Sequence, residues 1–195
     1  MVMKNGLAEL ASHLLSNIYT TTELKQVSVA LESLSQSPSF KSRAREIAKD
    51  NNLTAAIKKS QLLFLFKDVD IPVLYSFFSD LFGEKEFWMF SSDQFDYFDE
   101  FVQVFQLATE EVVVVNLVSA IDIETPDIVT ISQGLTKTLG KQAVIHLQVN
   151  PSIVGGAQVR IGNLVFDYSL RSKFHQFQCQ WLSQIAKTSE LVGRE

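Results

Sequence analysis

The chain has 195 residues, a formal net charge of −5 and 46% hydrophobic residues. This length allows one or two domains with a hydrophobic core, and no stretch approaches the roughly 18 consecutive apolar residues of a membrane-spanning helix. The acidic balance argues against a nucleic-acid-binding protein, which needs a basic face.

Targeting signals and disulfides are not expected. The first ten residues contain no apolar core and no cleavage pattern of a signal peptide, and they are not the Arg-rich stretch of a transit peptide. A single cysteine, Cys179, cannot form an intramolecular disulfide. We therefore expect an intracellular protein that is not itself inserted in a membrane.

Charge and composition divide the chain into two halves. Residues 61–111 carry two basic and eleven acidic side chains, whereas the segments on either side are close to neutral or basic. Eleven of the 15 Phe lie between positions 64 and 105, and six of the 8 Gly lie at or after position 134. We predict an N-terminal domain over residues 1–110 and a C-terminal domain over residues 111–195.

The N-terminal half has the periodicity of amphipathic helices. Apolar residues recur three and four positions apart over residues 7–18 and 24–34, with Thr22 as the expected N-cap of the second helix. Pro38 in the serine-rich stretch 35–39 predicts a turn. Further helices are expected over residues 40–48, 55–65 and 73–82. These segments predict an all-α bundle of about six helices.

An acidic, Phe-rich tract over residues 87–105 ends this half. Its aromatic residues share one helical face and its acidic residues occupy the others. One interpretation is a bundle helix that buries its rings. The other is a surface for a basic amphipathic partner helix, with Trp88 as a core residue or an exposed anchor. The apolar set is Phe95, Phe98, Phe101, Val102 and Phe105.

The C-terminal half alternates between strand and helix signals. A β-branched strand over residues 112–120 is followed by a helix that starts near Thr125 and ends before Gly140, and then by a strand over residues 143–149. Two short strands flank the turn Gly162-Asn163, and Ser169 caps a last helix. The order predicts a small α/β domain with a mixed sheet, so the fold class of the whole chain is α+β. The last helix has an apolar stripe of Leu170, Phe174, Phe177, Trp181, Leu182 and Ile185.

The sequence contains no recognisable active site. The histidines His13, His146 and His175 have no metal-ligand spacing, and His175 with Cys179 on one helical face is typical of packing. Gly155 and Gly156 lie between strands, where a bulge or bend needs a positive φ or a close backbone approach. A phosphate loop would instead precede a helix, with Gly-Lys-Ser/Thr. No catalytic residue, cofactor or metal is expected.

A dense series of motifs in the C-terminal half resembles one protein family. The motifs are Gly140-Lys141, Asn150-Pro151-Ser152, Gly155-Gly156, Val159-Arg160-Ile161-Gly162 and Asp167-Tyr168-Ser169. Their order and spacing resemble the C-terminal signature of the ATP synthase delta subunit, a family whose mitochondrial form is the oligomycin-sensitivity-conferring protein. The matching positions Gly155, Gly156, Arg160, Gly162, Asp167 and Ser169 are carried over chiefly as determinants of the fold of the domain that binds the b subunit.

This resemblance implies a non-catalytic stator subunit of an F-type ATP synthase. In the family, the N-terminal helical bundle holds N-terminal segments of alpha subunits, and the C-terminal domain holds the C-terminal end of the membrane-anchored b subunits. The complex would lie at the cytoplasmic face of a bacterial inner membrane. Two alternatives stay open: a small-ligand or nucleotide-binding α/β protein with a helical lid, and an adaptor of an unrelated complex.

A candidate groove for the alpha-subunit segment follows from amphipathicity rather than from the family. The first helix and the helix over residues 73–82 both have a strong apolar face, and we expect them to form the walls of the groove. The wall residues are Leu10, Leu14, Ile18, Val73 and Phe77.

Overall fold

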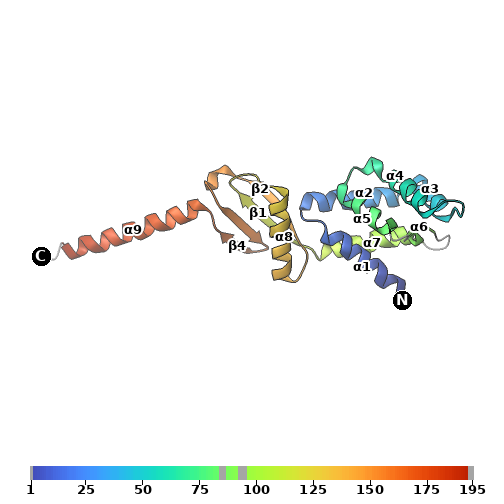
Figure 1. Cartoon of the computed structure of the whole chain (residues 1–195). Coiled ribbons are helices and arrows are strands. Elements are labelled where there is room, and N and C mark those ends of the chain that lie inside the picture. Colours follow the sequence, from blue (N-terminus) through green and yellow to red (C-terminus); the bar gives the residue numbers. More distant parts are fainter. Residues whose placement is uncertain (1, 84–86, 92–95, 193–195) are drawn as a thin grey trace.

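The computed structural model describes residues 2–83, 87–91 and 96–192. It shows an elongated chain with a helical bundle at one end, a sheet in the middle and a long last helix that points away from both (Figure 1). The α+β class predicted from the sequence is confirmed.

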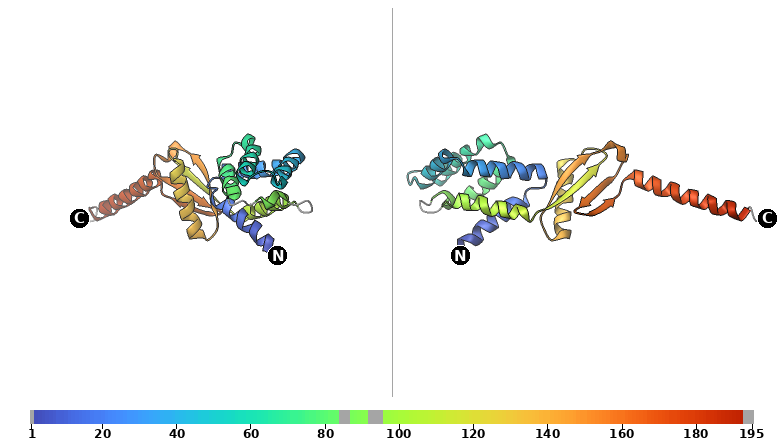
Figure 2. Two further views of the ribbon diagram at one scale, coloured as in Figure 1. Left: turned by 45° about the vertical axis from the view of Figure 1, so that its right-hand side comes forward. Right: turned by 180° about the vertical axis from the view of Figure 1, so that it is seen from behind.

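The described part of the N-terminal half is helical, as expected. Figure 2 shows from two further sides that these helices pack together at one end of the molecule. The bundle consists of α1 (Val2–Ser16), α2 (Thr21–Ser35), α3 (Pro38–Lys49), α4 (Ala55–Leu65), the 3₁₀ turn η1 (Lys67–Val69), α5 (Pro72–Gly83), α6 (Trp88–Ser91) and α7 (Tyr97–Glu110).

Two helix starts differ from the sequence prediction. The N-cap of α2 is Thr20 and not Thr22, because Thr20 and Glu23 form a capping box in which each side chain accepts from the backbone of the other. The predicted turn over residues 35–39 is shorter than expected. Ser37 caps α3 and Pro38 occupies its first turn, where a missing N–H costs nothing.

The acidic, Phe-rich tract is not one helix. It contains the short α6 and the start of α7, which is capped by Asp96, whose carboxylate accepts from the Asp99 amide. The predicted stripe residue Phe95 lies outside the described residues. Phe98, Phe101, Val102 and Phe105 are buried in the bundle, which supports the interpretation of this face as core. Trp88 is half-buried against the same core.

Phenylalanine rings fill the centre of the bundle. Phe66 stacks on Phe78 with ring centroids 4.1 Å apart, and Phe40 meets Phe66 edge to face at 5.3 Å. Phe98 from α7 lies 5.5 Å from Phe40. Aromatic pairs in these geometries stabilise a core beyond the area that they bury. The clustering of Phe in the sequence therefore reflects one aromatic core shared by α3, α5 and α7.

The C-terminal half forms a four-stranded mixed sheet in the order β2-β1-β3-β4. Strands β1 and β2 are parallel and joined by α8, and the other neighbouring pairs are antiparallel. The order strand, helix, strand, strand, strand, helix is confirmed. The elements are β1 (Val113–Ser119), α8 (Thr125–Leu139), β2 (Ala143–Val149), the 3₁₀ turn η2 (Pro151–Ile153), β3 (Ala157–Ile161), β4 (Leu164–Asp167) and α9 (Leu170–Val192).

Helix α8 covers β1 and β2 but leaves β4 open. Leu117, Ile145 and Ile128 of α8 form the centre of this small core. All four residues of β4 are exposed. Gly140 ends α8 with a φ of +66°, as the helix-stop signal predicted. Only a few residues separate α7 from β1, and the division into two domains at residue 110 stays a prediction.

Candidate functional site

The two adjacent glycines of the signature let the start of α9 approach the sheet closely. The Leu170 amide donates to the Gly155 carbonyl at 2.8 Å. A Cβ on Gly156 would lie 2.4 Å from the Tyr168 carbonyl oxygen, and a Cβ on Gly155 would lie 2.8 Å from a methyl group of Leu170. Gly156 also has a φ of +76°. The chain therefore fills this glycine turn with its own backbone and Leu170, and the expected need for close approach and positive φ is confirmed.

Asp167 and Ser169 shape the first turn of α9. The Ser169 amide donates to Asp167 Oδ1 at 2.9 Å, and Ser169 Oγ accepts from the Ser172 amide at 3.2 Å. Ser169 is buried, whereas Asp167 is exposed. Hydrogen bonds from Ser169, first through its side chain and then through its backbone, lower the pKa of Asp167 below the usual 3.8. These residues fix where α9 begins.

The remaining signature residues belong to the hairpin between β3 and β4. Gly162 has a φ of +57° in the two-residue turn Gly162-Asn163, as predicted. Arg160 is exposed, and its Nε donates to the Gly162 carbonyl at 3.2 Å. This bond is local, so Arg160 holds the turn next to it.

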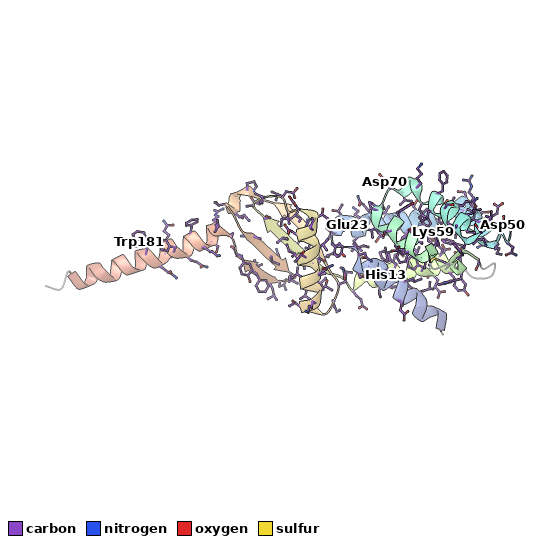
Figure 3. All side chains as sticks on the ribbon, in the orientation of Figure 1. His13, Glu23, Asp50, Lys59, Asp70 and Trp181 are labelled. Atoms are coloured by element: carbon purple, nitrogen blue, oxygen red, sulfur yellow. The ribbon has the colours of Figure 1, made fainter. Side chains whose placement is uncertain are left out.

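Beyond its first residue, helix α9 presents an apolar stripe whose described side chains are more than half exposed. Trp181 projects from α9 well beyond the sheet (Figure 3). Phe174, Phe177 and Trp181 are 65%, 58% and 57% exposed, and Leu170 at the base of the helix is 42% exposed. The spacing of four, three and four along this stripe is that of a helix that packs lengthwise against another helix. The stripe was also predicted to include Leu182 and Ile185, whose side chains are not among those that the structure describes.

The charges of α9 complete the description of this surface. The sequence contains no acidic residue between Asp167 and Glu190, whereas Arg171 and Lys173 flank the stripe. A contiguous patch of large exposed apolar side chains marks an interaction site, whereas a single exposed apolar residue does not. The arrangement is suited to binding another protein segment.

The candidate groove for the alpha-subunit segment lies where α1 and α5 meet. Leu14, Ile18 and Phe77 are buried in the bundle core, and Leu10 and Val73 are half-buried against it. Three of the five residues therefore serve as core of the bundle, and Ile18 lies just after the end of α1, so the groove stays a prediction. The exposed side chains on the same helices include His13, whose ring lies 6.0 Å from that of Phe77, and Tyr75.

The acidic face of α7 is partly neutralised within the bundle. Lys41 Nζ lies 2.8 Å from Asp99 Oδ2 and 3.2 Å from Asp96 Oδ2. The hydrogen bond to Asp99 is the main cause that raises the pKa of Lys41 above 10.5. This observation weakens the interpretation of the acidic tract as a surface for a basic partner.

The histidines have separate positions. His13 is exposed on α1, His175 is exposed on α9 with Nε2 3.9 Å from Cys179 Sγ, and His146 lies in β2 beside Thr21 of the bundle. In the described part of the chain, no group of three or more His, Cys, Asp or Glu side chains is placed to hold a metal ion. Among the described helices, none has both the length and the apolar character required to cross a membrane.

Sequence reasoning missed the residues that join the bundle to the sheet. Gln142 Nε2 donates to the Ile18 carbonyl at 3.0 Å, and Thr21 Oγ1 lies 3.2 Å from His146 Nδ1. The Thr-x-x-Glu pattern of Thr20 and Glu23 was a readable sign of the capping box at this position. Nothing in the sequence indicates that the partners lie about 125 residues away, because no local pattern connects positions so far apart.

Comparisons with known proteins agree on one family. The family model "ATP synthase delta (OSCP) subunit" matches residues 11–180. The ATP synthase subunit delta of Geotalea uraniireducens is 39% identical over 62 residues, which span 32% of this chain and only 34% of that relative. The ATP synthase subunit delta of Azotobacter vinelandii is 27% identical over 131 residues, which span 67% of this chain and 71% of that relative.

One solved structure shows a weaker likeness. A chain in the cryo-EM structure of the Toxoplasma gondii mitochondrial ATP synthase hexamer is 17% identical, with a TM-score of 0.41. The alignment covers 90% of this chain and 97% of that chain.

Proposed function

This chain belongs to the ATP synthase delta (OSCP) subunit family, and from that premise we propose that it is a non-catalytic stator subunit of an F-type ATP synthase. In this role it links the catalytic alpha/beta hexamer to the membrane-anchored b subunits. Its work is mechanical, because the protein resists the torque of the rotor so that rotation drives catalysis elsewhere in the complex.

One observation carries the proposal: the elongated chain ends in a helix whose apolar stripe is exposed. The bundle closes its own aromatic core, whereas Phe174, Phe177 and Trp181 are more than half exposed at the far end. An exposed row of aromatic side chains is costly in water unless a partner covers it. A linking protein needs such a surface at an end remote from its other attachment.

We assign the α9 stripe to the C-terminal end of the b subunit. Its narrow, regular spacing fits a partner helix that lies along α9. The glycine turn at Gly155 and Gly156 and the cap at Ser169 support this assignment indirectly, since they fix the direction in which α9 leaves the sheet. The signature residues thus act through the fold rather than by touching the partner.

We assign the side of the bundle where α1 and α5 meet to the N-terminal segment of the alpha subunit. Leu14 of α1 and Phe77 of α5 are buried, Ile18 is buried just after α1, and His13 and Tyr75 are exposed on the same two helices. A short amphipathic helix binds such a surface through side chains spaced three and four residues apart. We further propose that the protein lies on the periphery of a membrane complex, at the cytoplasmic face of a bacterial inner membrane, with anchoring supplied by the b subunit.

Calorimetric titration tests the α9 assignment directly. The full chain is titrated with a peptide from the C-terminal end of the b subunit, and we expect a dissociation constant in the micromolar range or tighter, which corresponds to about 8 kcal/mol. Phe177→Asp places a charge in the middle of the stripe and should weaken binding by roughly 30-fold or more, the effect of losing an interface anchor.

The matched control is Phe64→Asp. Phe64 is 68% exposed in α4 of the bundle, so it has the same residue type and a similar exposure at a distance from α9. This variant should bind the b peptide as the unmodified chain does. Equal weakening by both substitutions, or no binding by the unmodified chain, would contradict the assignment.

A further inference from the structure

The connection between α1 and α2 lies along the free edge of the sheet. Strand β2 is at one end of the order β2-β1-β3-β4, so its outer edge has no neighbouring strand. The Ile145 amide donates to the Tyr19 carbonyl at 2.8 Å, and Thr20 pairs with Ile145 in a parallel bridge. A loop of the bundle therefore supplies backbone partners to an edge that would otherwise be open.

One side-chain contact lies on each side of this bridge. Gln142, just before β2, donates from Nε2 to the Ile18 carbonyl at 3.0 Å. His146, just after Ile145, has Nδ1 3.2 Å from Thr21 Oγ1 at the start of α2. The connection and the first residue of α2 thus make hydrogen-bonding contacts with two residues of β2, Ile145 and His146, and with Gln142 just before the strand.

Apolar side chains cross the junction in both directions. Val144 of β2 is fully buried and belongs to the core cluster of the bundle. Tyr19 of the connection is half-buried against the sheet cluster formed by Leu117, Ile128 and Ile145. Val144 therefore lies in the core of the bundle and Tyr19 packs against the core of the sheet, and separating the halves would expose apolar surface of both.

Glu23 holds the connection from the bundle side. Its Oε2 accepts from the amides of Tyr19 and Thr20, both at 3.1 Å, while its own amide donates to Thr20 Oγ1 at 3.1 Å. Figure 3 labels Glu23 at the end of the bundle next to the sheet. Because the amides of Tyr19 and Thr20 donate to Glu23, the connection holds a shape in which the Tyr19 carbonyl accepts from the Ile145 amide.

We infer that this junction fixes the orientation of the sheet on the bundle, with Glu23 and Gln142 as positioning residues. Glu23 sets the shape of the connection, and Gln142 and Ile145 bind the sheet to it. The purpose of the junction rests on the proposed stator function, because a protein that links two partners holds them at a defined angle only if its two halves do not turn on each other. The contacts that define the junction do not depend on that function.

Hydrogen exchange of the unmodified full chain tests the inference without any substitution. The Ile145 amide points away from β1 to the bundle, whereas the neighbouring His146 amide points to β1 in the alternating pattern of a strand. If the halves stay joined, both amides should exchange with similar protection, since neither is exposed by separation. Exchange of Ile145 at the rate of an open loop, with His146 protected, would overturn the inference.

Distances between two spin labels provide the second measurement. After Cys179→Ser, labels are attached at Ala56→Cys in α4 and Lys137→Cys in α8, two exposed positions in different halves. Double electron–electron resonance should give one narrow distance distribution for this chain. A broad distribution would overturn the inference.

Matched variants identify the positioning residues. Gln142→Ala and Glu23→Ala should broaden the distance distribution and reduce the protection of the Ile145 amide by about fivefold or more, the effect of one net hydrogen bond. Glu23→Gln keeps an acceptor oxygen and should restore the narrow distribution. Gln158→Ala removes the contact of Gln158 with Asp167 within the sheet and should change neither readout.

The outcomes separate this inference from the stator proposal. An unchanged distribution in both alanine variants would overturn the role of Glu23 and Gln142, whatever the chain binds. Titration with the alpha and b peptides, carried out separately on the same variants, reports whether the proposed partners bind. If an alanine variant does not fold, as judged by circular dichroism, the exchange rate of the Ile145 amide in the unmodified chain decides whether the two halves stay joined.

Discussion

The side-chain ammonium of Lys41 in α3 lies 2.8 Å from a carboxylate oxygen of Asp99 in the first turn of α7. The second oxygen of Asp99 accepts from the Ser35 hydroxyl at 2.5 Å, at the end of α2. Lys41 also lies 3.2 Å from Asp96, the N-cap of α7. One carboxylate thus joins three helices, and part of the acidity that distinguishes the sequence serves the interior of the bundle.

Replacing Lys41 should destabilise the bundle in a pH-dependent way. Lys41→Met should cost about 1 kcal/mol, because a partly exposed pair in a small network contributes little more. The pKa of Lys41 is raised above 10.5 in the folded chain, so its contribution is complete below that pH and lost as the pH rises through the folded pKa. Urea unfolding of both chains from neutral pH upward should show a difference in stability that is constant up to about pH 10.5 and shrinks above it. A difference that grows in this range would contradict the assignment, and Lys137→Met, at an exposed position of α8, serves as the control.

Substituting Gly156 should destabilise the start of α9. Gly156→Ala places a Cβ 2.4 Å from the Tyr168 carbonyl oxygen at a φ of +76°, and we expect a loss of roughly 2–4 kcal/mol in the free energy of unfolding. Gly134→Ala is the matched control, since Gly134 lies in α8 with nothing within 4 Å of its Cβ position. That change should stabilise the chain by about 0.5–1 kcal/mol. Similar effects of the two substitutions in urea unfolding would show that the turn is not tight.

Asp167 should contribute to stability only above acidic pH. Its pKa is lowered from 3.8 by hydrogen bonding to Ser169, so its contribution is present above the unfolded pKa and lost as the pH falls through the folded one. The melting temperature of Asp167→Asn should therefore lie below that of the unmodified chain at neutral pH, and the gap should close below about pH 3.8. Asp80→Asn, an exposed carboxylate in α5, measures the general effect of losing one charge. A gap that widens in acid would refute the role of the Asp167–Ser169 contact.

ATP and ADP should leave the melting temperature unchanged. The turn at Gly155 and Gly156 is occupied by Tyr168 and Leu170 of the same chain, which leaves no backbone cradle for a phosphate group at this turn. Ligands that bind the native state raise its apparent stability, so a thermal-shift titration is sensitive to this class of function. A shift that rises with nucleotide concentration would favour the alternative of a nucleotide-binding α/β protein.

Local sequence signals predicted much of the fold. The strand at residues 143–149, the stop at Gly140 and the hairpin turn at Gly162 depend on neighbouring residues, and each was found where expected. The predicted start of α2 was wrong because three threonines precede Glu23, and only the capping box distinguishes Thr20 from the other two. The interpretation of the acidic tract as one helix was wrong, because the periodicity of its apolar residues does not reveal that a new helix begins after the cap at Asp96.

The candidate site was harder to predict because it depends on tertiary contacts. The apolar stripe of α9 was readable, but its exposure follows from the direction in which the glycine turn sends the helix. Leu14 and Phe77 have the periodicity of a groove wall and are buried in the core, since the sequence does not show which apolar face meets another helix. The junction of Tyr19 with Ile145 joins positions too distant in sequence for any local pattern.

A bridging assay tests most directly the central claim that this chain connects two partners. A peptide from the N-terminal segment of the alpha subunit is immobilised, and a labelled peptide from the C-terminal end of the b subunit is added with or without the full chain. We predict that the b peptide is retained only when the chain is present, that Phe177→Asp abolishes its retention while the chain itself stays bound, and that Phe64→Asp has no effect. Failure of the unmodified chain to retain the b peptide, although it binds the alpha peptide, would contradict the account.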